Sequence, residues 1–574
     1  MKTQLCHQSS KQNIMKRFLL LSLSFLIYTS IYCQKNITID FATEKGFIKD
    51  IFGGNRGADS TEAIPFLHEM GIKYIRTHDF HGAADYFYYS DFWNKDNNGN
   101  FTTINTSFDP ANANHYHWTD TDNSIQHMIE NDFVPYFRIG TSYPNPNFIL
   151  EPMTPPSDAE NDGLNFSKFS QLVLHTVKHY NSGWDNGFDY EIPYWEIWNE
   201  PGGQFWDGTA IQFFEMYKAI STTVKTQFPN LKIGAPGAVP TTTLGIQTIY
   251  REDFIGYCKE QNLDLDFYSW HAYGLENPYG LKQISANIRS ILDANNFTDT
   301  ESHLTEINAN LGAGLSEFIT TSKGAAYYLS MLLTAQESDI DMLLLYPSVA
   351  PVKPNLFIPG FNWTKSAYGL KAFALLKEET PIIVQTTGNE VVPEYNDGSL
   401  NFMVFAAKDE EESKLYAVVS NYQSDITAYH IELSNLPWAG EHGTIITKNI
   451  ITDSETFTES NITLPVNANS FDITGMDSPS VLLLRMEADV TIDTDEQSLP
   501  TDIRIFPNPA TDVLTIEGRG LQKVEILNMA GQKLKSAKAQ SDAITIDISQ
   551  KIGGLYLIKI MSESGIIFRK VVIE

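Results

Sequence analysis

The stretch Trp195-Glu196-Ile197-Trp198-Asn199-Glu200-Pro201 places two carboxylates and an amide at the end of a short apolar run that begins at Tyr194. Such a run is typical of a strand buried on both faces. Side-chain alternation relaxes at a strand end, so Asn199 and Glu200 can both reach the same opening. Glu196 lies deeper and is predicted to be a structural carboxylate satisfied by hydrogen bonds. An isolated glutamate is most simply a helix N-terminal acid, but the Asn-Glu-Pro context favours a chemical role for Glu200.

Similar apolar runs alternate with amphipathic helical segments from residue 48 to residue 380. The predicted strands are Ile48–Gly54, Tyr74–His78, Val134–Gly140, Tyr194–Glu200, Lys232–Pro236, Leu265–Tyr273, His303–Asn308 and Met342–Tyr346. The predicted helices include Thr61–Met70, Phe166–Tyr180, Thr209–Phe228, Leu281–Ala294 and Phe318–Ala335. This alternation predicts an α/β fold with a (β/α)8 TIM barrel over residues 35–380. A doubly wound sheet is the alternative, but the absence of a glycine-rich phosphate turn favours the barrel.

The sequence after residue 380 loses its long helical periods. Residues 381–488 carry alternating strand patterns separated by turn residues, which predicts an all-β sandwich domain. Residues 489–502 are acidic and polar and are expected to be a solvated linker. Residues 503–574 return to alternating strands and predict a small C-terminal β-sandwich.

Residues 1–34 have the pattern of a signal peptide. Met15-Lys16-Arg17 supplies a basic start, and the apolar run Phe18 to Ile27 is shorter than the ~20 residues of a membrane-spanning helix. The start of translation is therefore either Met1 or Met15. A lipoprotein anchored through Cys33 is the less favoured alternative, because bulky Tyr32 precedes that cysteine.

Composition excludes several classes of protein. The 574 residues carry a formal net charge of −30, which argues against nucleic acid and anionic membranes as partners, because both attract clustered Lys and Arg. Hydrophobic residues make up 42% of the chain, enough for sizeable cores. The three cysteines are too few for a zinc site or a disulfide framework.

A second carboxylate is predicted at the same rim of the barrel. Glu306 lies near the end of the predicted seventh strand, His303–Asn308, whereas Glu200 ends the fourth. Catalytic residues of such barrels project from the C-terminal ends of strands. Glycoside hydrolysis requires two carboxylates, one as proton donor and one as nucleophile or base.

This arrangement resembles the clan A glycoside hydrolases, and within them family 39, the β-xylosidase and α-L-iduronidase group. Further similarity lies in Ile37–Phe41 with Ile48 to Asn55, in Tyr74–His81 and in Asp266–Tyr273, which resemble the first, second and sixth strands of that family. The resemblance covers roughly residues 36–488 and includes the β-sandwich. It implies that Glu200 is the acid/base and Glu306 the nucleophile. The chain departs from the family in a long insertion from Phe80 to Trp118, so sugar specificity does not carry over.

The tail carries its own resemblance. The ordered segments FPNPATDVLTI, VEILNMAGQKL and GLYLIKI with RKVVIE, which begin at Phe506, Val524 and Gly554, resemble the C-terminal sorting domain of the Bacteroidetes type IX secretion system. The resemblance implies that residues 503–574 are an address read by that machinery. It also implies a secreted protein or one held at the outer-membrane cell surface. A further accessory sandwich is the alternative.

Further rim residues are expected to bind substrate or support the carboxylates. Asn199 can hydrogen-bond the sugar 2-hydroxyl, Arg76 can keep Glu306 ionised, and Tyr273 can donate a hydrogen bond to Glu306. His78 and His271 are expected to contact substrate hydroxyls, with a satisfied core histidine as the alternative for each.

Aromatic residues of the insertion have two open interpretations. Trp93 and Trp118 either line sugar subsites or bury a long loop. No cofactor or metal is expected, because His115, His117 and His127 lack a convincing carboxylate partner.

The sequence thus predicts a secreted retaining glycosidase, β-xylosidase-like, that acts by double displacement on plant or algal polysaccharides or oligosaccharides. One alternative is a glycosidase specific for an algal galactan or a sulfated polysaccharide. Another is a non-catalytic carbohydrate-binding surface protein. The expected partners are the glycan substrate and the type IX secretion machinery, with no nucleic acid and no membrane insertion.

Overall fold

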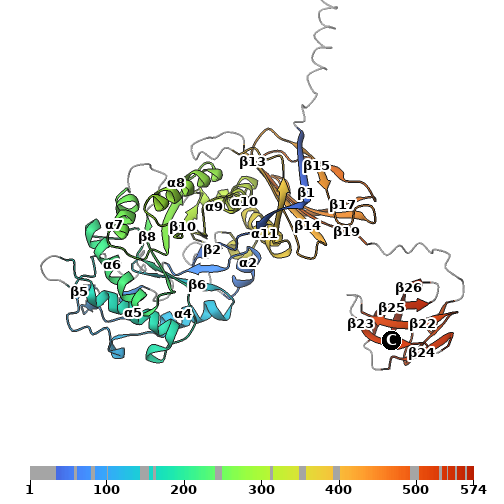
Figure 1. Cartoon of the computed structure of the whole chain (residues 1–574), viewed down its shortest axis with the longest axis horizontal. Coiled ribbons are helices and arrows are strands. Elements are labelled where there is room, and N and C mark those ends of the chain that lie inside the picture. The colour runs from blue at the N-terminus through green and yellow to red at the C-terminus, as the bar shows by residue number, and fades with distance from the viewer. Residues whose placement is uncertain are drawn as a thin grey trace, which may run out of the picture. The chain divides into compact units, whose positions relative to one another are not determined.

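The protein is described by a computed structural model. The described residues are 34–56, 61–78, 85–97, 99, 101–141, 154–158, 163–203, 205–238, 248–309, 314–347, 357–391, 401–490, 503–528, 533–539, 541–549, 553–562 and 565–573. The predicted signal peptide, except for Gln34, and the predicted linker from residue 491 onward lie outside them. The chain divides into two compact units, Met1–Asp489 and Val490–Glu574 (Figure 1).

Parallel strands of the first unit close into a barrel, as the strand–helix alternation predicts. Among the described residues, the order around the barrel is β2 (Phe52–Asn55), β3 (Tyr74–Arg76), β6 (Val134–Ile139), β7 (Tyr194–Ile197), β8 (Lys232–Ala238), β9 (Phe267–Tyr273), β10 (Glu301–Asn308) and β11 (Met342–Leu345). The helices between these strands are α2 (Ile64–Glu69), α4 (Thr119–Glu130), α5 (Ser167–Ser182), α6 (Ala210–Gln227), α7 (Phe254–Glu260), α8 (Leu281–Ala294), α9 (Leu315–Phe318) and α10 (Ser322–Gln336), and α11 (Lys365–Glu379) follows the last strand. The predicted (β/α)8 fold is confirmed.

Local signals explain where the helices begin and end. α6 begins with a capping box in which Thr209 and Gln212 satisfy each other's backbone N–H groups. α5 ends at Gly183, whose φ of 70° lies in the left-handed region that favours glycine. The insertion after β3 adds a short helix α3 (Tyr86–Tyr89) and a hairpin of β4 (Trp93–Lys95) and β5 (Phe101–Ile104).

The N-terminal strand belongs to a different sheet from the one expected. β1 (Gln34–Phe47) pairs with β12 (Ile382–Thr386) and β15 (Ala428–Ser434), and not with the barrel. The expectation that residues from 35 onward belong to the barrel, with Ile37–Phe41 in its first strand, is therefore wrong. The inward residues Ile37, Ile39 and Phe41 pack in the hydrophobic core of the accessory sheet.

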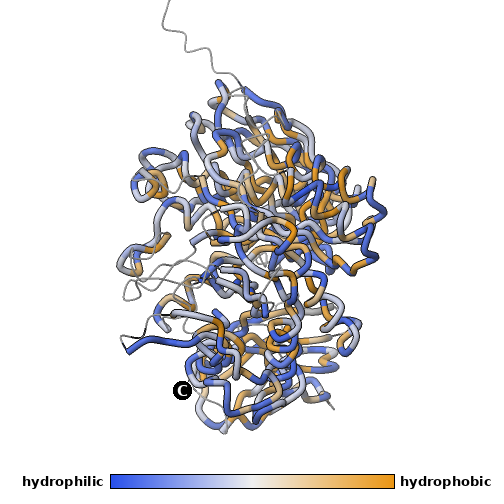
Figure 2. Tube along the Cα trace, turned by 90° about the vertical axis from the view of Figure 1, so that its left-hand side faces the viewer, coloured by the Kyte–Doolittle hydropathy of each residue, from blue (hydrophilic) through white to orange (hydrophobic). Residues whose placement is uncertain are grey.

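The accessory β-region is one nine-stranded sheet among the described residues. Its order is β17 (Thr456–Leu464), β16 (Gly443–Ile451), β19 (Ser480–Asp489), β14 (Lys414–Gln423), β13 (Asn401–Lys408), β12, β1, β15 and β18 (Ser470–Thr474). Met403, Phe405 and Leu483 of this sheet share the barrel's hydrophobic core with α10 and α11. Hydrophobic segments accordingly run through the interior of this unit (Figure 2).

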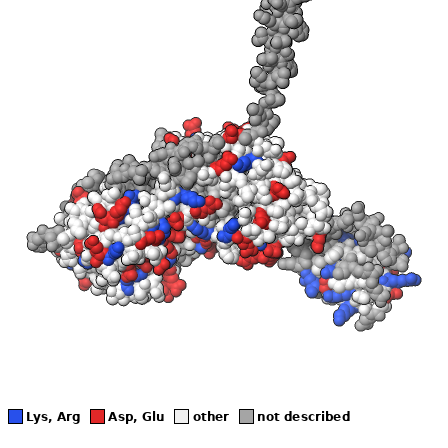
Figure 3. Space-filling view, turned by 45° about the horizontal axis from the view of Figure 1, so that its top comes forward, with Lys and Arg blue, Asp and Glu red and all other residues white. Residues whose placement is uncertain are grey.

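Charged side chains lie on the surface of the first unit. Acidic and basic side chains are interspersed on the face drawn in Figure 3. No helix within the described ranges is both long and apolar enough to cross a membrane.

The second unit has a hydrophobic core of its own, formed by residues such as Leu514, Val524 and Ile560. Its two sheets are β20 (Arg504–Phe506), β21 (Val513–Glu517) and β24 (Ala543–Asp547), and β23 (Lys533–Lys538), β22 (Leu521–Leu527), β25 (Gly554–Ser562) and β26 (Gly565–Ile573).

Candidate active site

The chain leaves β7 through two unusual backbone conformations. Trp198 has a φ of 73° and Glu200 a φ of 46°, both in the left-handed region that non-glycine residues seldom adopt. The backbone N–H of Trp198 donates to Ile139 O at 2.6 Å, and that of Glu200 donates to Gly237 O at 2.9 Å. These bonds hold the strand end between β6 and β8 while its side chains depart from regular alternation. Asn199 and Glu200 therefore both reach the mouth of the barrel.

A β-bulge in β10 orients the second carboxylate. Leu304 pairs with Trp270 of β9, and the next pair joins Glu306 to His271, so Thr305 is an extra residue. The side chains of Thr305 and Glu306 consequently both face the polar centre of the barrel. Thr305 Oγ1 donates to Glu196 Oε1 at 3.1 Å, whereas Glu306 turns towards Arg76.

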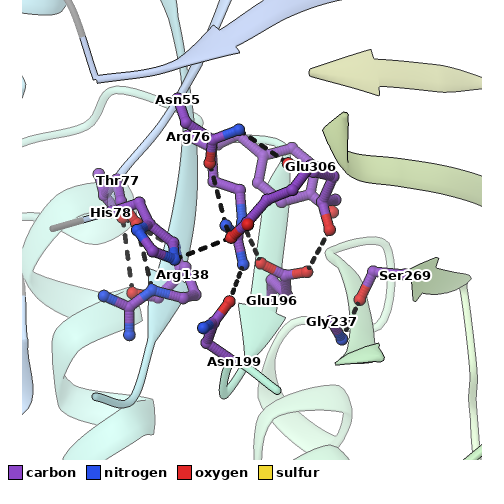
Figure 4. A network of polar contacts seen from close by, with 12 residues as sticks. Asn55, Arg76, Thr77, His78, Arg138, Glu196, Asn199, Gly237, Ser269 and Glu306 are labelled. Carbon is purple, nitrogen blue, oxygen red and sulfur yellow. Dashed lines mark hydrogen bonds and ion pairs between the residues drawn. The ribbon is translucent and has the colours of Figure 1, made fainter. Parts of the chain in front are cut away.

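Glu306 is surrounded by donors. Its Oε1 accepts from Arg76 Nη1 at 2.7 Å and lies 2.9 Å from His78 Nε2 (Figure 4). Its Oε2 accepts from Tyr273 Oη at 2.5 Å. Burial by itself would raise the pKa of Glu306, but the nearby His271, His78 and Arg76 outweigh burial and hold this pKa well below its ordinary value. The carboxylate is thus kept ionised and oriented in an interior position.

Arg76 connects the site to the end of β2 and to β7. Besides Glu306, its guanidinium donates to Glu196 Oε2 at 2.6 Å, Asn55 Oδ1 at 2.9 Å and Asn199 Oδ1 at 2.9 Å. Burial would lower the pKa of Arg76, but the charges of Glu196 and Glu306 raise it, so the arginine stays charged. A fully buried guanidinium with two carboxylate partners has its planar donors well satisfied.

Glu200 and Glu306 approach each other across His271. Nδ1 of His271 lies 2.8 Å from Glu200 Oε1 and 3.5 Å from Glu306 Oε2. One oxygen of Glu200 and one of Glu306 lie within 4.8 Å of each other. Retaining glycosidases place their carboxyl groups ~5–5.5 Å apart, whereas inverting ones need ~6.5–9.5 Å to admit a water molecule.

The same three side chains also have the spacing of a metal-ligand group. Their ligand atoms are already engaged with one another, and Glu306 additionally accepts from Arg76 and Tyr273. A cation beside the buried guanidinium would be repelled. The donor set therefore fits a hydrogen-bonded carboxylate pair better than a metal ion.

Two buried nitrogens of the site have no hydrogen-bond partner within the described part of the chain. They are Nδ2 of Asn199 and Nε2 of His271. Asn199 is fixed through its Oδ1 by Arg76, so its amide N–H groups are free to donate elsewhere. Buried polar groups of this kind are normally satisfied, and a sugar hydroxyl, which can both donate and accept, is a suitable partner.

Seven of the residues predicted from the sequence lie together at this rim: Arg76, His78, Asn199, Glu200, His271, Tyr273 and Glu306. His78 Nε2 and His271 Nδ1 lie against the carboxylates. Contact of the two histidines with substrate hydroxyls stays a prediction. Asn55 was not predicted as a site residue, although its place at the end of β2 was a usable signal.

Trp93 and Trp118 lie elsewhere, and the expectation that they bind substrate is corrected. Both side chains are buried in the hydrophobic core that the insertion shares with the barrel. Nε1 of Trp93 donates to Tyr86 Oη at 2.8 Å, and the Trp118 ring stacks on His179 of α5 with centroids 4.0 Å apart. The two tryptophans therefore pack the long insertion against the barrel.

Comparison with known proteins agrees with this geometry. Residues 61–318 match the glycosyl hydrolases family 39, and residues 504–574 match the secretion system C-terminal sorting domain. A β-xylosidase of Geobacillus stearothermophilus is 26% identical over 201 residues, which cover 31% of this chain and 37% of that protein. A β-xylosidase of Caldicellulosiruptor saccharolyticus is 28% identical over 125 residues, which cover 21% of this chain and 22% of that protein. The matches thus span well under two thirds of these relatives.

Solved structures share the fold. A glucosidase from Croceicoccus marinus has a TM-score of 0.63 at 19% identity, covering 79% of this chain and 99% of its own. A monomeric β-xylosidase from Caulobacter crescentus has a TM-score of 0.58 at 15% identity, with the same coverage of 79% and 99%. The chain therefore carries a glycosyl hydrolase family 39 domain, followed by a type IX secretion C-terminal sorting domain.

Proposed function

We propose that the protein is a retaining glycoside hydrolase in which Glu200 is the acid/base and Glu306 the nucleophile. The observation that carries the proposal is that one oxygen of Glu200 and one of Glu306 lie within 4.8 Å of each other, a spacing that favours a retaining over an inverting pair of carboxylates. The low pKa of Glu306 suits a nucleophile that must be ionised before substrate binds.

The reaction proceeds in two displacements. Glu200 donates a proton to the glycosidic oxygen while Glu306 Oε2 or Oε1 attacks the anomeric carbon, so the C–O bond to the leaving group breaks as the ester bond forms. Glu200, now a carboxylate, then removes a proton from water. That water attacks the anomeric carbon and releases Glu306. His271 Nδ1, at 2.8 Å from Glu200 Oε1, holds this carboxyl group in position during both displacements.

A β-linked neutral pyranoside is the proposed substrate class, with xylose as the first candidate. The matched relatives of the catalytic domain are named β-xylosidases. The proposed sugar residue binds in the barrel mouth, where Asn199 Nδ2 donates to its 2-hydroxyl. The long insertion after β3 favours attack at a chain end. Early release of long oligosaccharides during digestion would contradict this exo action.

The sorting domain indicates where the enzyme works. It directs the chain to type IX secretion, so the protein is secreted or attached to the cell surface. Its substrate is accordingly expected among extracellular glycans.

The test compares three variants on a panel of aryl glycosides and intact glycans. Glu306→Ala should lose activity by about 10⁴-fold or more, because no other group can form the covalent intermediate. Glu200→Ala should lose about 10²–10⁴-fold on substrates with poor leaving groups and much less on activated aryl glycosides. Azide should restore turnover of the activated substrates by Glu200→Ala. Glu260→Ala, an exposed glutamate at the end of α7, is the control and should match the unaltered protein.

The stereochemistry of the first product gives an independent readout. NMR of the freshly released sugar should show the anomeric configuration of the substrate. Release of the inverted anomer, or near-full activity of Glu306→Ala, would refute the assignment.

A further inference from the structure

A cavity of about 690 Å³ lies where the barrel meets the accessory sheet. Its walls come from the residues that follow β9 and β10, from α9 and α10, and from the end of β14. These elements belong to one compact unit. The volume falls within the ~300–1,000 Å³ of typical ligand sites, and the catalytic carboxylates do not line the cavity.

The cavity begins where the candidate active site ends. Gly274, on its wall, directly follows Tyr273, whose hydroxyl donates to Glu306. Ala309, also on its wall, follows Asn308 at the end of the strand that carries Glu306. Gly274 N donates to Asn308 O at 3.3 Å and joins the two segments. The cavity therefore adjoins the ends of the two strands that carry Tyr273 and Glu306.

The polar groups on the wall suit a ligand that carries hydroxyl groups better than a charged ligand. Lys323 and Glu276 are both exposed and contribute one positive and one negative charge, and exposed Gln423 adds an amide. Sugar hydroxyls both donate and accept hydrogen bonds, so a wall with ammonium, carboxylate and amide groups can satisfy them. Within the described residues Lys323 forms no ion pair, and its Nζ lies 5.7 Å from the centre of the Tyr422 ring.

The wall is preformed. Tyr422 Oη donates to Glu276 O at 2.7 Å, which ties the accessory sheet to the loop after β9. The Tyr327 ring lies 5.8 Å from both the Tyr422 and the Phe318 ring. Tyr327 is buried, and its hydroxyl has no partner in the part of the chain that the structure describes. Little reorganisation is needed to receive a ligand, which lowers the cost of binding.

We propose that this cavity is a subsite for a further, uncharged sugar residue of the glycan that is cleaved at Glu200 and Glu306. The inference rests on the proposed glycosidase function and adds to it a contribution of the accessory sheet to substrate binding. It predicts that oligosaccharides gain affinity from this subsite, whereas aryl monosaccharides gain none.

Gly314 offers a direct way to block the cavity. It lies on the wall, its φ of −82° is accessible to any residue, and a Cβ placed there meets no atom within 4 Å. Gly314→Trp should therefore fill the cavity without backbone strain, and Gly314→Ala should leave it open. Gly256→Trp is the matched control, because Gly256 in α7 also has open space around its Cβ and lies away from the cavity.

The measurement is kcat/KM for the aryl monosaccharide and for the di-, tri- and tetrasaccharide of the same sugar, xylo-oligosaccharides in the first instance. Gly314→Trp should lower kcat/KM on oligosaccharides by about tenfold, mainly through KM, and leave the aryl monosaccharide unchanged. Lys323→Met should also lower kcat/KM on oligosaccharides, because it removes a hydrogen-bond donor from the wall of the cavity.

The outcomes separate the two proposals. No turnover of any aryl glycoside by the unaltered protein would refute the proposed function. The subsite would be overturned if kcat/KM did not change with the length of the oligosaccharide. It would also be overturned if Gly314→Trp lowered kcat/KM equally on all substrates. Loss of oligosaccharide binding in Gly314→Trp placed in the inactive Glu306→Ala background, measured by calorimetry with the tetrasaccharide, would support it.

Discussion

Arg76 and His78 lie next to each other on the chain and both contact Glu306 Oε1. Arg76 is shared with Glu196, so removing it would leave two buried carboxylates without their cation. A change of that kind typically costs ~3–5 kcal/mol and would confuse activity with folding. His78 contacts Glu306 at the edge of the network and is the better residue for testing the electrostatics of this carboxylate.

His78→Asn should move the acid limb of kcat/KM to higher pH. Glu306 has a folded-state pKa well below the ordinary 4.5 because His271, His78 and Arg76 outweigh its burial. It therefore stays ionised as the pH falls through 4.5, and losing one of these neighbours raises its pKa. The pH profile of kcat/KM on an aryl glycoside measures the shift. His430→Asn is the control, because His430 forms an exposed pair with Asp472 in the accessory sheet. This variant should leave the pH profile unchanged.

The contribution of Glu306 to the free energy of unfolding should also decrease as the pH falls. A carboxylate whose pKa is lower in the folded state stabilises the fold above its unfolded pKa, and this contribution is lost as the pH falls through the folded-state pKa. The difference in urea midpoint between the unaltered protein and His78→Asn should therefore shrink below pH 4.5. An unshifted acid limb together with a constant midpoint difference would contradict this account of Glu306.

At the scale of the elements, irregularities in β8 and β10 shape the site. Ala235 of β8 pairs with Tyr268 and Ala238 with Trp270, so β8 also carries an extra residue. Gly237 in this bulge has a φ of 58°, and a Cβ on it would lie 3.3 Å from Glu196 Oε1 and 3.5 Å from His271 Nε2. The strand can adopt this path only with a residue that tolerates the conformation and leaves the space empty.

Gly237→Ala should reduce both stability and activity. The left-handed backbone costs a non-glycine residue ~1–2 kcal/mol, and the added methyl presses on the network of Glu196, Arg76 and His271. Gly183→Ala is the matched control, because Gly183 has a φ of 70° and nothing within 4 Å of its Cβ. Thermal unfolding should occur at a lower temperature in both variants, whereas kcat should fall only in Gly237→Ala. Equal kcat in the two would mean that the bulge does not constrain the site.

The two ends of β10 have different tasks. Glu306 lies near its C-terminal end, whereas Glu301 begins the strand and contacts His303 Nε2 at 2.9 Å and Lys232 Nζ. Burial would raise the pKa of Glu301, but His303 and Lys232 lower it to about 2. Function at one rim and stability at the other is the usual division in this fold.

Glu301→Gln should therefore destabilise the protein without affecting catalysis. The stabilisation from ionised Glu301 is present above pH 4.5 and is lost as the pH falls to about 2. The urea midpoint should drop at pH 7, and the difference from the unaltered protein should narrow with acidification. kcat measured at pH 7 on folded protein should not change; a tenfold loss would show that this end of the strand influences the site.

At the scale of the whole molecule, the barrel and the accessory sheet share one hydrophobic core. Every residue of α10 except Lys323 is buried, and its neighbours include Met403 and Phe405 of β13. A helix that is hydrophobic all round requires partners on all sides. The sorting domain has a separate core.

Deleting residues 503–574 should leave turnover and folding of residues 35–488 intact. The described residues of the sorting domain form a hydrophobic core of their own, so its folding does not depend on the core of the first unit. Calorimetry should show that the truncated protein keeps one transition for barrel and accessory sheet and loses only that of the tail. A large fall in kcat on truncation would mean that the tail takes part in catalysis.

Much of the fold follows from the sequence. The short continuous apolar runs in the sequence predict the barrel strands, because a strand that is covered on both faces needs apolar side chains on both. Chain order then places Glu200 after the fourth strand and Glu306 on the seventh, and a closed barrel brings both ends to one rim. The resemblance of the tail likewise identifies the sorting domain.

Only the tertiary structure decided how these parts meet. Periodicity is a local signal and carries no information on pairing partners, so it could not place β1 in the accessory sheet. It could not reveal the bulge at Thr305 that turns Glu306 inward, or the contact of His78 and His271 with carboxylates. The sequence is compatible with Trp118 either as a sugar-binding surface or as a core residue. Its stacking on His179 shows that it is a core residue. Register and long-range packing depend on which surfaces meet after the chain has folded, and those contacts join residues far apart in sequence.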